Sequence, residues 1–485
     1  MSISRRDFLK TGSMGVAMSF LSPGLFTKDM FAAGTPRKVL VVLQLGGGND
    51  SVNTFIPYAD ARYRTLRPTL AIPDANIVKL DGSMGMHPAL GRLKPHWDAG
   101  KFTFVSNVGF PTLDRSHFRC TDVWSTADET STALRNPTGW LGKYADTHLS
   151  SGNPSVLTNV AIGGRNPMGI QADQVLPIAI SSQASFDVVV DNNADRTPFT
   201  DSLRTLYDLP RTQLDPEFIR SQGKDTFEAI DLFKTIPGPS TTVLYPNNGL
   251  SNAFKLAAQI IAGNLGTHAI WISTGGYDTH SQQGNAHNNL LSGVADALFN
   301  FQADLVARGI ADNVLVMAWS EFGRRLQENA SQGTDHGKAG TMFLLGNAVK
   351  GGAYYGTPPD LSNLPGGDLA TEIDFRAVYG TIIKDFFGKD PDPVLGRTYE
   401  NLGFLQPVVI GCDTKYGDLN EDLRVDTVDS VILSNHLVGN LPQGTAPYTA
   451  APTYADLDES GRVDVADLVI LNNHLVGNIP CLPKQ

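Results

Sequence analysis

The C-terminal part of the chain contains an internal repeat, which constrains the fold more tightly than any other feature of the sequence. The segment DLNEDLRVDTVDSVILSNHLVGN begins at Asp418 and returns 38 residues later as DLDESGRVDVADLVILNNHLVGN from Asp456. Both copies open with closely spaced acidic residues and continue into an apolar segment with the same ending. Two copies of one short motif predict a small module made of two equivalent units.

The acidic residues of each copy have the spacing of a twelve-residue calcium-binding loop. Such a loop places oxygen ligands at positions 1, 3, 5, 9 and 12 and uses a backbone carbonyl at position 7. The first copy offers Asp418, Asn420, Asp422, Asp426 and Asp429, with the carbonyl of Arg424. The second copy offers Asp456, Asp458, Ser460, Asp464 and Asp467, with the carbonyl of Arg462. We therefore expect two calcium ions here; the alternative is a pair of acidic, solvated loops.

Upstream of the repeat, strand-like and helix-like segments alternate. The run RKVLVVLQLGGGNDSVN from residue 37 is apolar and β-rich until it meets glycines. Residues 252–265 and 290–309 have helical periodicity, and they lead into the strand-like runs HAIWIST and NVLVMAWS. This alternation predicts an α/β fold, with a mostly parallel sheet sandwiched by helices over residues 37–405. The repeat forms a separate, small all-α module of residues 411–485.

Polar side chains with metal-binding chemistry follow the strand-like runs. They are Asp50 after the first run, Asp278 and His280 after HAIWIST, Glu321 after NVLVMAWS, and Asp335 and His336 in GTDHGKAGT. Ligands bind at the carboxyl edge of such sheets, and carboxylate oxygens and imidazole nitrogens bind zinc, manganese or magnesium. We therefore expect one or two divalent ions at this edge. The alternative is that these residues are turn formers and helix caps.

Ser116 stands where an amphipathic helix would begin, after the strand-like run KFTFVSNVGF. A serine at this position is a good helix N-cap, and capping alone could explain it. A serine hydroxyl activated by a metal and by the positive end of a helix is also a nucleophile. The sequence leaves both roles open.

The N-terminus and the charge distribution bear on location and partners. The segment SISRRDFLKTGSMGVAMSFLSPGLF has the pattern of a twin-arginine export signal, which we expect to occupy residues 1–33. No other segment is long and apolar enough to span a bilayer, so we expect a periplasmic or extracellular protein. The net charge of −11, most of it in the tail, offers no basic footprint for nucleic acid.

The motifs of the core resemble a known group of enzymes. LGGGND, RSHF, GGYDTH, SEFGR, GTDHG and DFRAVYG together look like a bacterial, Tat-exported domain-of-unknown-function family placed in the alkaline phosphatase/sulfatase superfamily. The resemblance implies that Asp50, Ser116 and Glu321 face one metal. It implies that Asp278, His280 and His336 face another, with Asp335 close by. A formylglycine sulfatase is not expected, because Cys120 is followed by TDVW.

The paired calcium loops, each followed by one helix and with Asp at position 12, resemble a type I dockerin. This resemblance implies docking onto a cohesin-like partner, often in assemblies that degrade polysaccharide. Cys412 and Cys481 bracket the module, and two packed calcium-loop units tend to bring their chain ends together. We predict a disulfide between these cysteines; the alternative is two buried, free thiols.

Two functions are compatible with these observations. The first is an exported, metal-dependent hydrolase of phosphate or sulfate esters, with polysaccharide-related substrates as one option, which the dockerin tethers to an extracellular assembly. The second is a catalytically silent binding or assembly protein that keeps the fold and docks through its tail. A metal assay combined with an ester-substrate screen distinguishes them.

Overall fold

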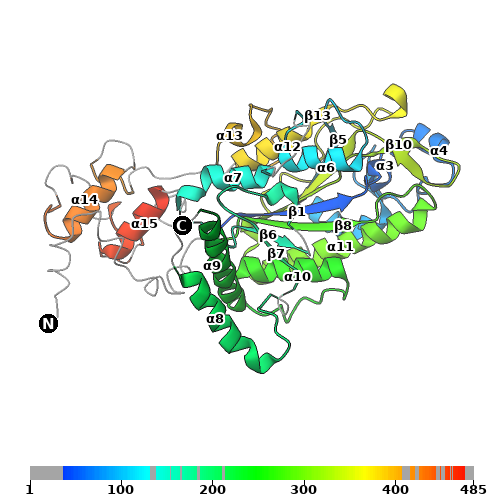
Figure 1. Ribbon diagram of the computed structural model, residues 1–485. Helices are drawn as coiled ribbons and strands as arrows, with labels where there is room; N and C mark the ends of the chain where they lie inside the picture. The colour runs from blue at the N-terminus through cyan, green and yellow to red at the C-terminus, as the bar shows by residue number, and fades with distance from the viewer. Residues whose placement is uncertain are drawn as a thin grey trace. The chain divides into compact units, whose positions relative to one another are not determined.

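The computed structural model describes most of the chain, and the described residues belong to two compact units. One unit spans residues 38–408, and the other contains residues 409–485 (Figure 1). The expected export signal lies outside the described residues. The described residues are 37–130, 138–152, 154–163, 166–182, 186–209, 214–406, 416–420, 425, 427–443, 448, 454–458, 460 and 462–475.

The larger unit is built on an eight-stranded sheet with the order β13-β5-β12-β9-β1-β8-β6-β7. Strand β12 runs antiparallel to its neighbours β5 and β9, and the other neighbouring pairs are parallel. The predicted mostly parallel sheet is therefore confirmed. The strands are β1 (Val39–Gly46), β5 (Phe102–Gly109), β6 (Asn159–Ile162), β7 (Ile178–Ile180), β8 (Ala269–Gly275), β9 (Val314–Trp319), β12 (Gly340–Leu345) and β13 (Ile373–Asp374).

Helices cover both faces of this sheet, because successive side chains of a strand point to opposite sides. Val41 and Leu43 of β1 belong to a core cluster with side chains of α10 and α11, whereas Leu40 and Val42 belong to a second cluster with α6, α7 and α12. Figure 1 shows these two groups of helices on opposite sides of β1. Each buried leucine or valine contributes roughly 1.5–3 kcal/mol. The helices are α6 (His117–Thr126), α7 (Trp140–His148), α10 (Gly249–Ala262), α11 (Gln283–Ala307) and α12 (Phe375–Thr381).

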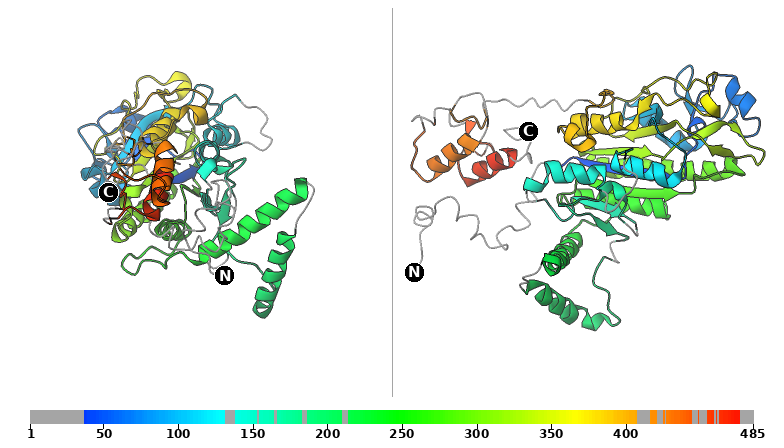
Figure 2. Two further views of the ribbon diagram at one scale, coloured as in Figure 1. Left: turned by 90° about the vertical axis from the view of Figure 1, so that its left-hand side faces the viewer. Right: turned by 45° about the horizontal axis from the view of Figure 1, so that its top comes forward.

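Shorter elements surround the sheet, and one helical pair extends from it. Helices α8 (Arg196–Asp208) and α9 (Leu214–Lys234) pack on each other and reach away from the sheet (Figure 2). The remaining helices are α3 (Ser51–Thr54), α4 (Arg62–Leu66), α5 (Lys94–Asp98) and α13 (Asp392–Leu395). The remaining strands are β2 (Phe55–Ile56), β3 (Val78–Lys79), β4 (Gly85–Met86), β10 (Arg324–Glu328) and β11 (Thr334–His336).

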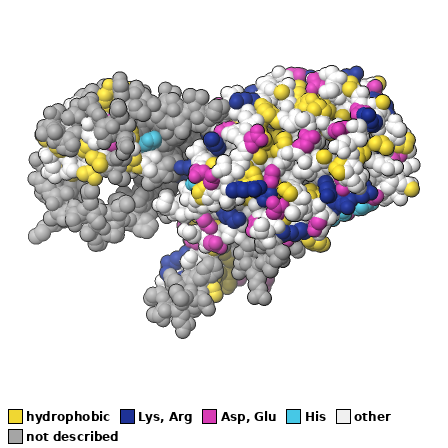
Figure 3. Space-filling view, turned by 90° about the horizontal axis from the view of Figure 1, so that it is seen from above, with side chains coloured by type: hydrophobic (Ala, Val, Ile, Leu, Met, Phe, Trp, Pro, Cys, Tyr) yellow, Lys and Arg dark blue, Asp and Glu magenta, His cyan; other side chains and the backbone are white. Residues whose placement is uncertain are grey.

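The surface of the core carries charges of both signs. Figure 3 shows one face on which lysine and arginine side chains are interspersed with aspartate and glutamate. No helix among the described residues is long and apolar enough to cross a membrane.

The second unit contains two helices of equal length, one in each copy of the repeat. They are α14 (Thr427–Leu437) and α15 (Val465–Leu475), and they contact each other. Their shared core includes Leu433 from α14, Leu471 from α15 and Leu457 from the second loop. The two equivalent helical units predicted from the repeat are present.

Candidate metal centre

Three neighbouring strands end side by side and bring their loops together. Gly46 of β1 pairs with Gly275 of β8, and Gln44 of β1 pairs with Trp319 of β9. Gly47, which follows β1, has a φ of 122°, and a Cβ atom on it would lie 2.5 Å from the backbone nitrogen of Asp278. Only glycine permits this close approach of the β1 loop to the β8 loop.

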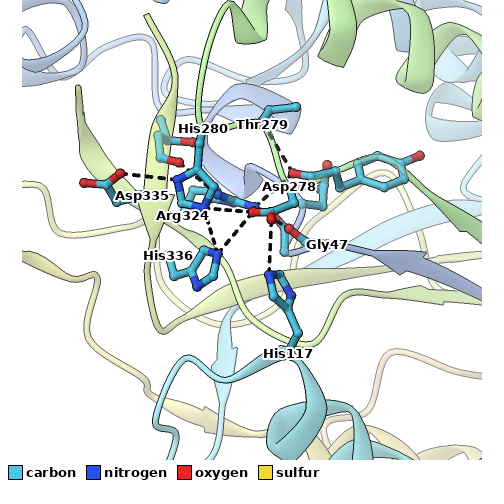
Figure 4. Close-up of polar contacts among 12 residues, drawn as sticks. Gly47, His117, Asp278, Thr279, His280, Arg324, Asp335 and His336 are labelled. Carbon is cyan, nitrogen blue, oxygen red and sulfur yellow. Dashed lines mark hydrogen bonds and ion pairs between the residues drawn. The ribbon is translucent and has the colours of Figure 1, made fainter. Parts of the chain in front are cut away.

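A cluster of possible metal ligands lies at this edge of the sheet. His117 opens α6, Asp278 lies in the loop after β8, and His336 ends β11 (Figure 4). One ligand atom from each of these residues lies within 4.8 Å of the other two. Nε2 of His336 is 3.1 Å from Oδ1 of Asp278, and Nε2 of His117 is 3.5 Å from its Oδ2. Both imidazoles therefore present Nε2 to one carboxylate.

The other ring nitrogens of these two histidines have partners that determine their tautomers. Nδ1 of His117 lies 2.7 Å from Oε1 of Glu321, and Nδ1 of His336 lies 3.1 Å from the carbonyl oxygen of Arg115. Carboxylate and carbonyl oxygens only accept hydrogen bonds, so we assign the proton to Nδ1 in each ring. Nε2 then carries a lone pair, and in His117 this buried atom has no hydrogen-bond partner among the described residues.

This arrangement fits a divalent metal ion. Two lone pairs directed at a carboxylate repel it unless a cation lies between them, and metal-bound histidines typically donate their other N–H to an acceptor. Burial lowers the pKa of His336, which favours the neutral imidazole that a metal requires. Burial alone would raise the pKa of Asp278, but the hydrogen bond and the charge of Arg324 lower it, so the carboxylate is ionised.

His280 lies at the same place. Its Nε2 is 3.0 Å from both Oδ1 of Asp278 and Nε2 of His336, and its Nδ1 is 3.4 Å from Oδ1 of Asp335. Asp335 also accepts a hydrogen bond from the Asn329 side chain at 3.2 Å. The structure thus brings together Asp278, His280 and His336, with Asp335 beside them.

Two residues in the quoted motifs received no role from the sequence, although both are central here. His117 directly follows Ser116 in RSHF, and Arg324 ends SEFGR. The buried guanidinium of Arg324 donates to Oδ1 of Asp278 at 2.5 Å and to backbone carbonyls of the β1, β8 and β11 segments. It therefore connects the loops that form the cluster. Phe322 supports the two rings from a centroid distance of 4.8 Å to each of His117 and His336.

Asp50 is not part of this cluster. Its fully buried carboxylate is paired with Arg67 at 2.5 and 3.0 Å and accepts a hydrogen bond from Gln283 at 2.5 Å. Burial alone would raise the pKa of Asp50, but the charge and hydrogen bonds of Arg67 hold it below the ordinary value. The carboxylate of Asp50 also caps α3 through the N–H of Asn53 at 3.3 Å.

Ser116 and Glu321 occupy other positions around the cluster. Ser116 is the N-cap of α6, and its Oγ accepts the N–H of Arg119 at 3.4 Å. Glu321 accepts from His117 and from the N–H of Gly47 at 2.8 Å. Asp50, Ser116 and Glu321 thus each have partners within the protein, and a shared metal at these three residues stays a prediction of the motif resemblance.

The second calcium loop is described almost completely. Asp456, Asp458 and Asp467 bring carboxylate oxygens within 4.8 Å of one another. Asp467 accepts the N–H groups of Leu457 at 2.5 Å and of Asp464 at 2.7 Å, which orients its carboxylate toward the loop. Ser460 and Arg462 lie in the same loop, where the Ser460 hydroxyl is 3.2 Å from the Arg462 carbonyl oxygen.

The first loop shows the same pattern where it is described. Asp429 accepts the N–H of Leu419 at 2.7 Å, as Asp467 accepts that of Leu457. Asp418 and Asn420 are also described. The predicted ligands Asp422, Arg424 and Asp426 and the cysteines Cys412 and Cys481 lie outside the described residues.

Family models match both units of the chain. Residues 416–476 match the model described as Dockerin type I domain. The C-terminal module is a type I dockerin. Residues 256–384 match the model described as Protein of unknown function (DUF1501), and this stretch contains Asp278, His336 and Arg324. The two matches agree with the resemblance to a domain-of-unknown-function family and to a type I dockerin, whereas the export signal and the placement in the phosphatase/sulfatase superfamily stay predictions. No curated protein matches this chain.

Several solved structures are similar to the chain. PsFucS1 sulfatase from Pseudoalteromonas sp. has 11% identity, with 81% of this chain and 76% of that chain covered and a TM-score of 0.36. Ps i-CgsB has 10% identity, coverages of 76% and 75%, and a TM-score of 0.34. Alkaline phosphatase from the Antarctic bacterium TAB5 has 12% identity, coverages of 66% and 95%, and a TM-score of 0.26. These likenesses concern the fold alone.

Proposed function

We propose that the core is a metal-dependent hydrolase of phosphate or sulfate esters. The observation that carries this proposal is the convergence of two Nε2 lone pairs, from His117 and His336, on the ionised carboxylate of Asp278. A divalent ion at such a point supplies positive charge for an anionic ester and for the oxygen that leaves. His280 completes a set of three imidazoles and one carboxylate.

Ser116 is the residue that we propose as nucleophile. It immediately precedes His117 and lies at the N-terminus of α6, where the helix dipole favours negative charge. Its hydroxyl would lose its proton to solvent and attack the phosphorus or sulfur atom, and the ester oxygen would leave as the alcohol. Water would then release phosphate or sulfate from the serine. Ser116 can serve both as helix cap and as nucleophile. Its oxygen accepts the N–H of Arg119 before the reaction and would attack the ester during it.

We further propose that the dockerin tethers this hydrolase to an extracellular assembly. A twin-arginine signal in residues 1–33 would export the chain, the core of residues 37–405 would carry the activity, and residues 411–485 with two calcium ions would bind a cohesin-like partner. The substrates would then include esters on polysaccharide-related molecules.

The test uses the full chain, stripped with a chelator and reloaded with zinc, manganese or magnesium in excess calcium. We expect hydrolysis of 4-nitrophenyl phosphate or 4-nitrophenyl sulfate that disappears on stripping and returns on reloading. His336→Ala should lose the metal, whereas His148→Ala should keep it, because His148 bonds to the carbonyl of Asp390. A wild-type chain that binds none of these metals would overturn the proposal. A metal-loaded chain without activity on either ester class would point to the binding-protein alternative.

A further inference from the structure

We propose that the core holds a single divalent metal ion, and that the guanidinium of Arg324 is a built-in cation in place of a second ion. The inference rests on the proposed metal site at Asp278. It concerns the two-metal arrangement that the motif resemblance implies, with Asp50, Ser116 and Glu321 around one of the ions. The contacts of Asp50, Glu321 and Arg324 argue that this arrangement does not hold a second metal ion.

The carboxylate of Asp50 is already neutralised by an arginine whose donors are all in use. Arg67 is fully buried, and its Nη1 and Nη2 donate to the two oxygens of Asp50 at 2.5 and 3.0 Å. Its Nε donates to the carbonyl of Leu326 at 2.7 Å. A buried guanidinium that binds a carboxylate through two hydrogen bonds is difficult to displace. Separating Arg67 from Asp50 would leave a buried charge unpaired. Asp50 is therefore a structural partner of Arg67.

The carboxylate of Glu321 is also committed to protein donors. Its Oε1 accepts from the backbone of Gly47 at 2.8 Å and from His117 at 2.7 Å, and its Oε2 lies 3.2 Å from the Ser320 hydroxyl, which also bonds to the carbonyl oxygen of Leu45 at 2.6 Å. These bonds make Glu321 the group that orients a metal-binding histidine. A metal ion on Oε1 of Glu321 would have to displace the hydrogen bond that determines the tautomer of His117.

Arg324 places a permanent positive charge where a second ion would share Asp278. Its Nη2 lies 2.5 Å from Oδ1 of Asp278, and the side chain is fully buried. A guanidinium stays charged even when buried. Metal pairs that share a site lie about 3.5–4 Å apart, so a second ion near Oδ1 would meet this fixed charge at close range. Oδ2 of Asp278, near His117, remains for one ion.

The consequence is a mixed centre in which one cation is exchangeable and the other is covalently part of the chain. Chelation would remove only the first. The contact of Arg324 with Oδ1 of Asp278 would hold this carboxylate in place in the metal-free protein, so the site would stay assembled without metal.

Manganese titration of the chelator-stripped full chain tests this inference. Saturating calcium occupies the dockerin loops, bound manganese is counted by elemental analysis, and electron paramagnetic resonance reports whether the ions are isolated or spin-coupled. We expect one manganese per chain with the spectrum of an isolated ion. Two equivalents per chain, or a spin-coupled pair, would overturn the single-metal inference and leave the proposed function intact. No bound manganese, zinc or magnesium would overturn both.

Two variants sharpen the result. Asp278→Asn should weaken manganese binding by more than about 100-fold, because it removes a ligand and not only a supporting partner. Asp50→Asn should still bind one equivalent with an affinity within about threefold of wild type, whatever stability it loses at Arg67. Loss of the metal in folded Asp50→Asn would contradict the inference. If Asp50→Asn does not fold, the stoichiometry of the unaltered chain still decides.

Discussion

Nδ1 of His117 lies 2.7 Å from Oε1 of Glu321. This contact joins the start of α6 to the end of β9, and the same carboxylate oxygen reaches the β1 loop through Gly47. A glutamate in this position holds the ring so that Nε2 is directed at Asp278. The geometry of the candidate metal centre therefore depends on Glu321, which contacts the proposed ligand His117 and would not bind the metal itself.

The Glu321→Gln variant tests this dependence. The amide has no negative charge to stabilise the Nδ1 proton of His117, so we expect metal affinity to fall by roughly 10- to 100-fold. Competition against a chromophoric zinc chelator measures the change. Glu400→Gln, on the exposed surface, is the matched control and should leave the affinity unchanged. An affinity within twofold of wild type in Glu321→Gln would show that the contact does not support the metal.

Ser116 can be tested as nucleophile separately from its role as cap. Ser116→Ala removes both the hydroxyl and the cap of α6, at a cost of about 1 kcal/mol in unfolding free energy, whereas Ser116→Asn retains a capping side chain. We expect both variants to lower kcat by roughly a thousandfold or more while metal content stays near wild type. Full activity in the stable Ser116→Asn variant would restrict Ser116 to capping.

The dockerin should depend on calcium for its stability. Clustered carboxylates such as Asp456, Asp458 and Asp467 repel one another without an ion, and calcium at a hundred times its Kd adds about 2.7 kcal/mol per site. Calorimetry of the full chain should show one transition that moves to lower temperature with chelator, and Asp467→Asn should reduce bound calcium from two equivalents to one. Asp191→Asn, an exposed substitution in the core, should retain both. Identical scans with calcium and with chelator would rule out the calcium loops.

The cysteines that bracket the dockerin remain a prediction. A bridge between Cys412 and Cys481 closes a loop of about 70 residues and would stabilise the module by roughly 4 kcal/mol on the chain-entropy model. Non-reducing peptide mapping of the exported protein should recover the joined peptides. Cys120 is buried and free, and it serves as the internal reference for an unpaired thiol. Alkylation of all three cysteines without reduction would show that the bridge is absent.

The sequence predicted the sheet and most of the cluster because both follow from local patterns. An apolar, β-rich run that ends in glycines, as before Gly47, marks the end of a strand, and parallel strands end at one edge. Asp278, His280 and His336 were found in this way. His117 was missed, although it adjoins Ser116, since a lone histidine at the start of a helix has no periodic signal. The helical pair α8 and α9 was also missed.

Taken alone, the amino-acid sequence determined the features whose parts lie close together in the chain. The ligands of each calcium loop fall within twelve consecutive residues. Strands and helices are likewise indicated by the spacing of apolar residues over short stretches of the chain. Only the tertiary structure decided which carboxylates are free to bind a metal. Asp50 meets Arg67, and Asp278 meets Arg324 and two histidines, through strand register and loop paths that join residues between 17 and 161 positions apart. Such pairings depend on packing in three dimensions, and no local spacing encodes them.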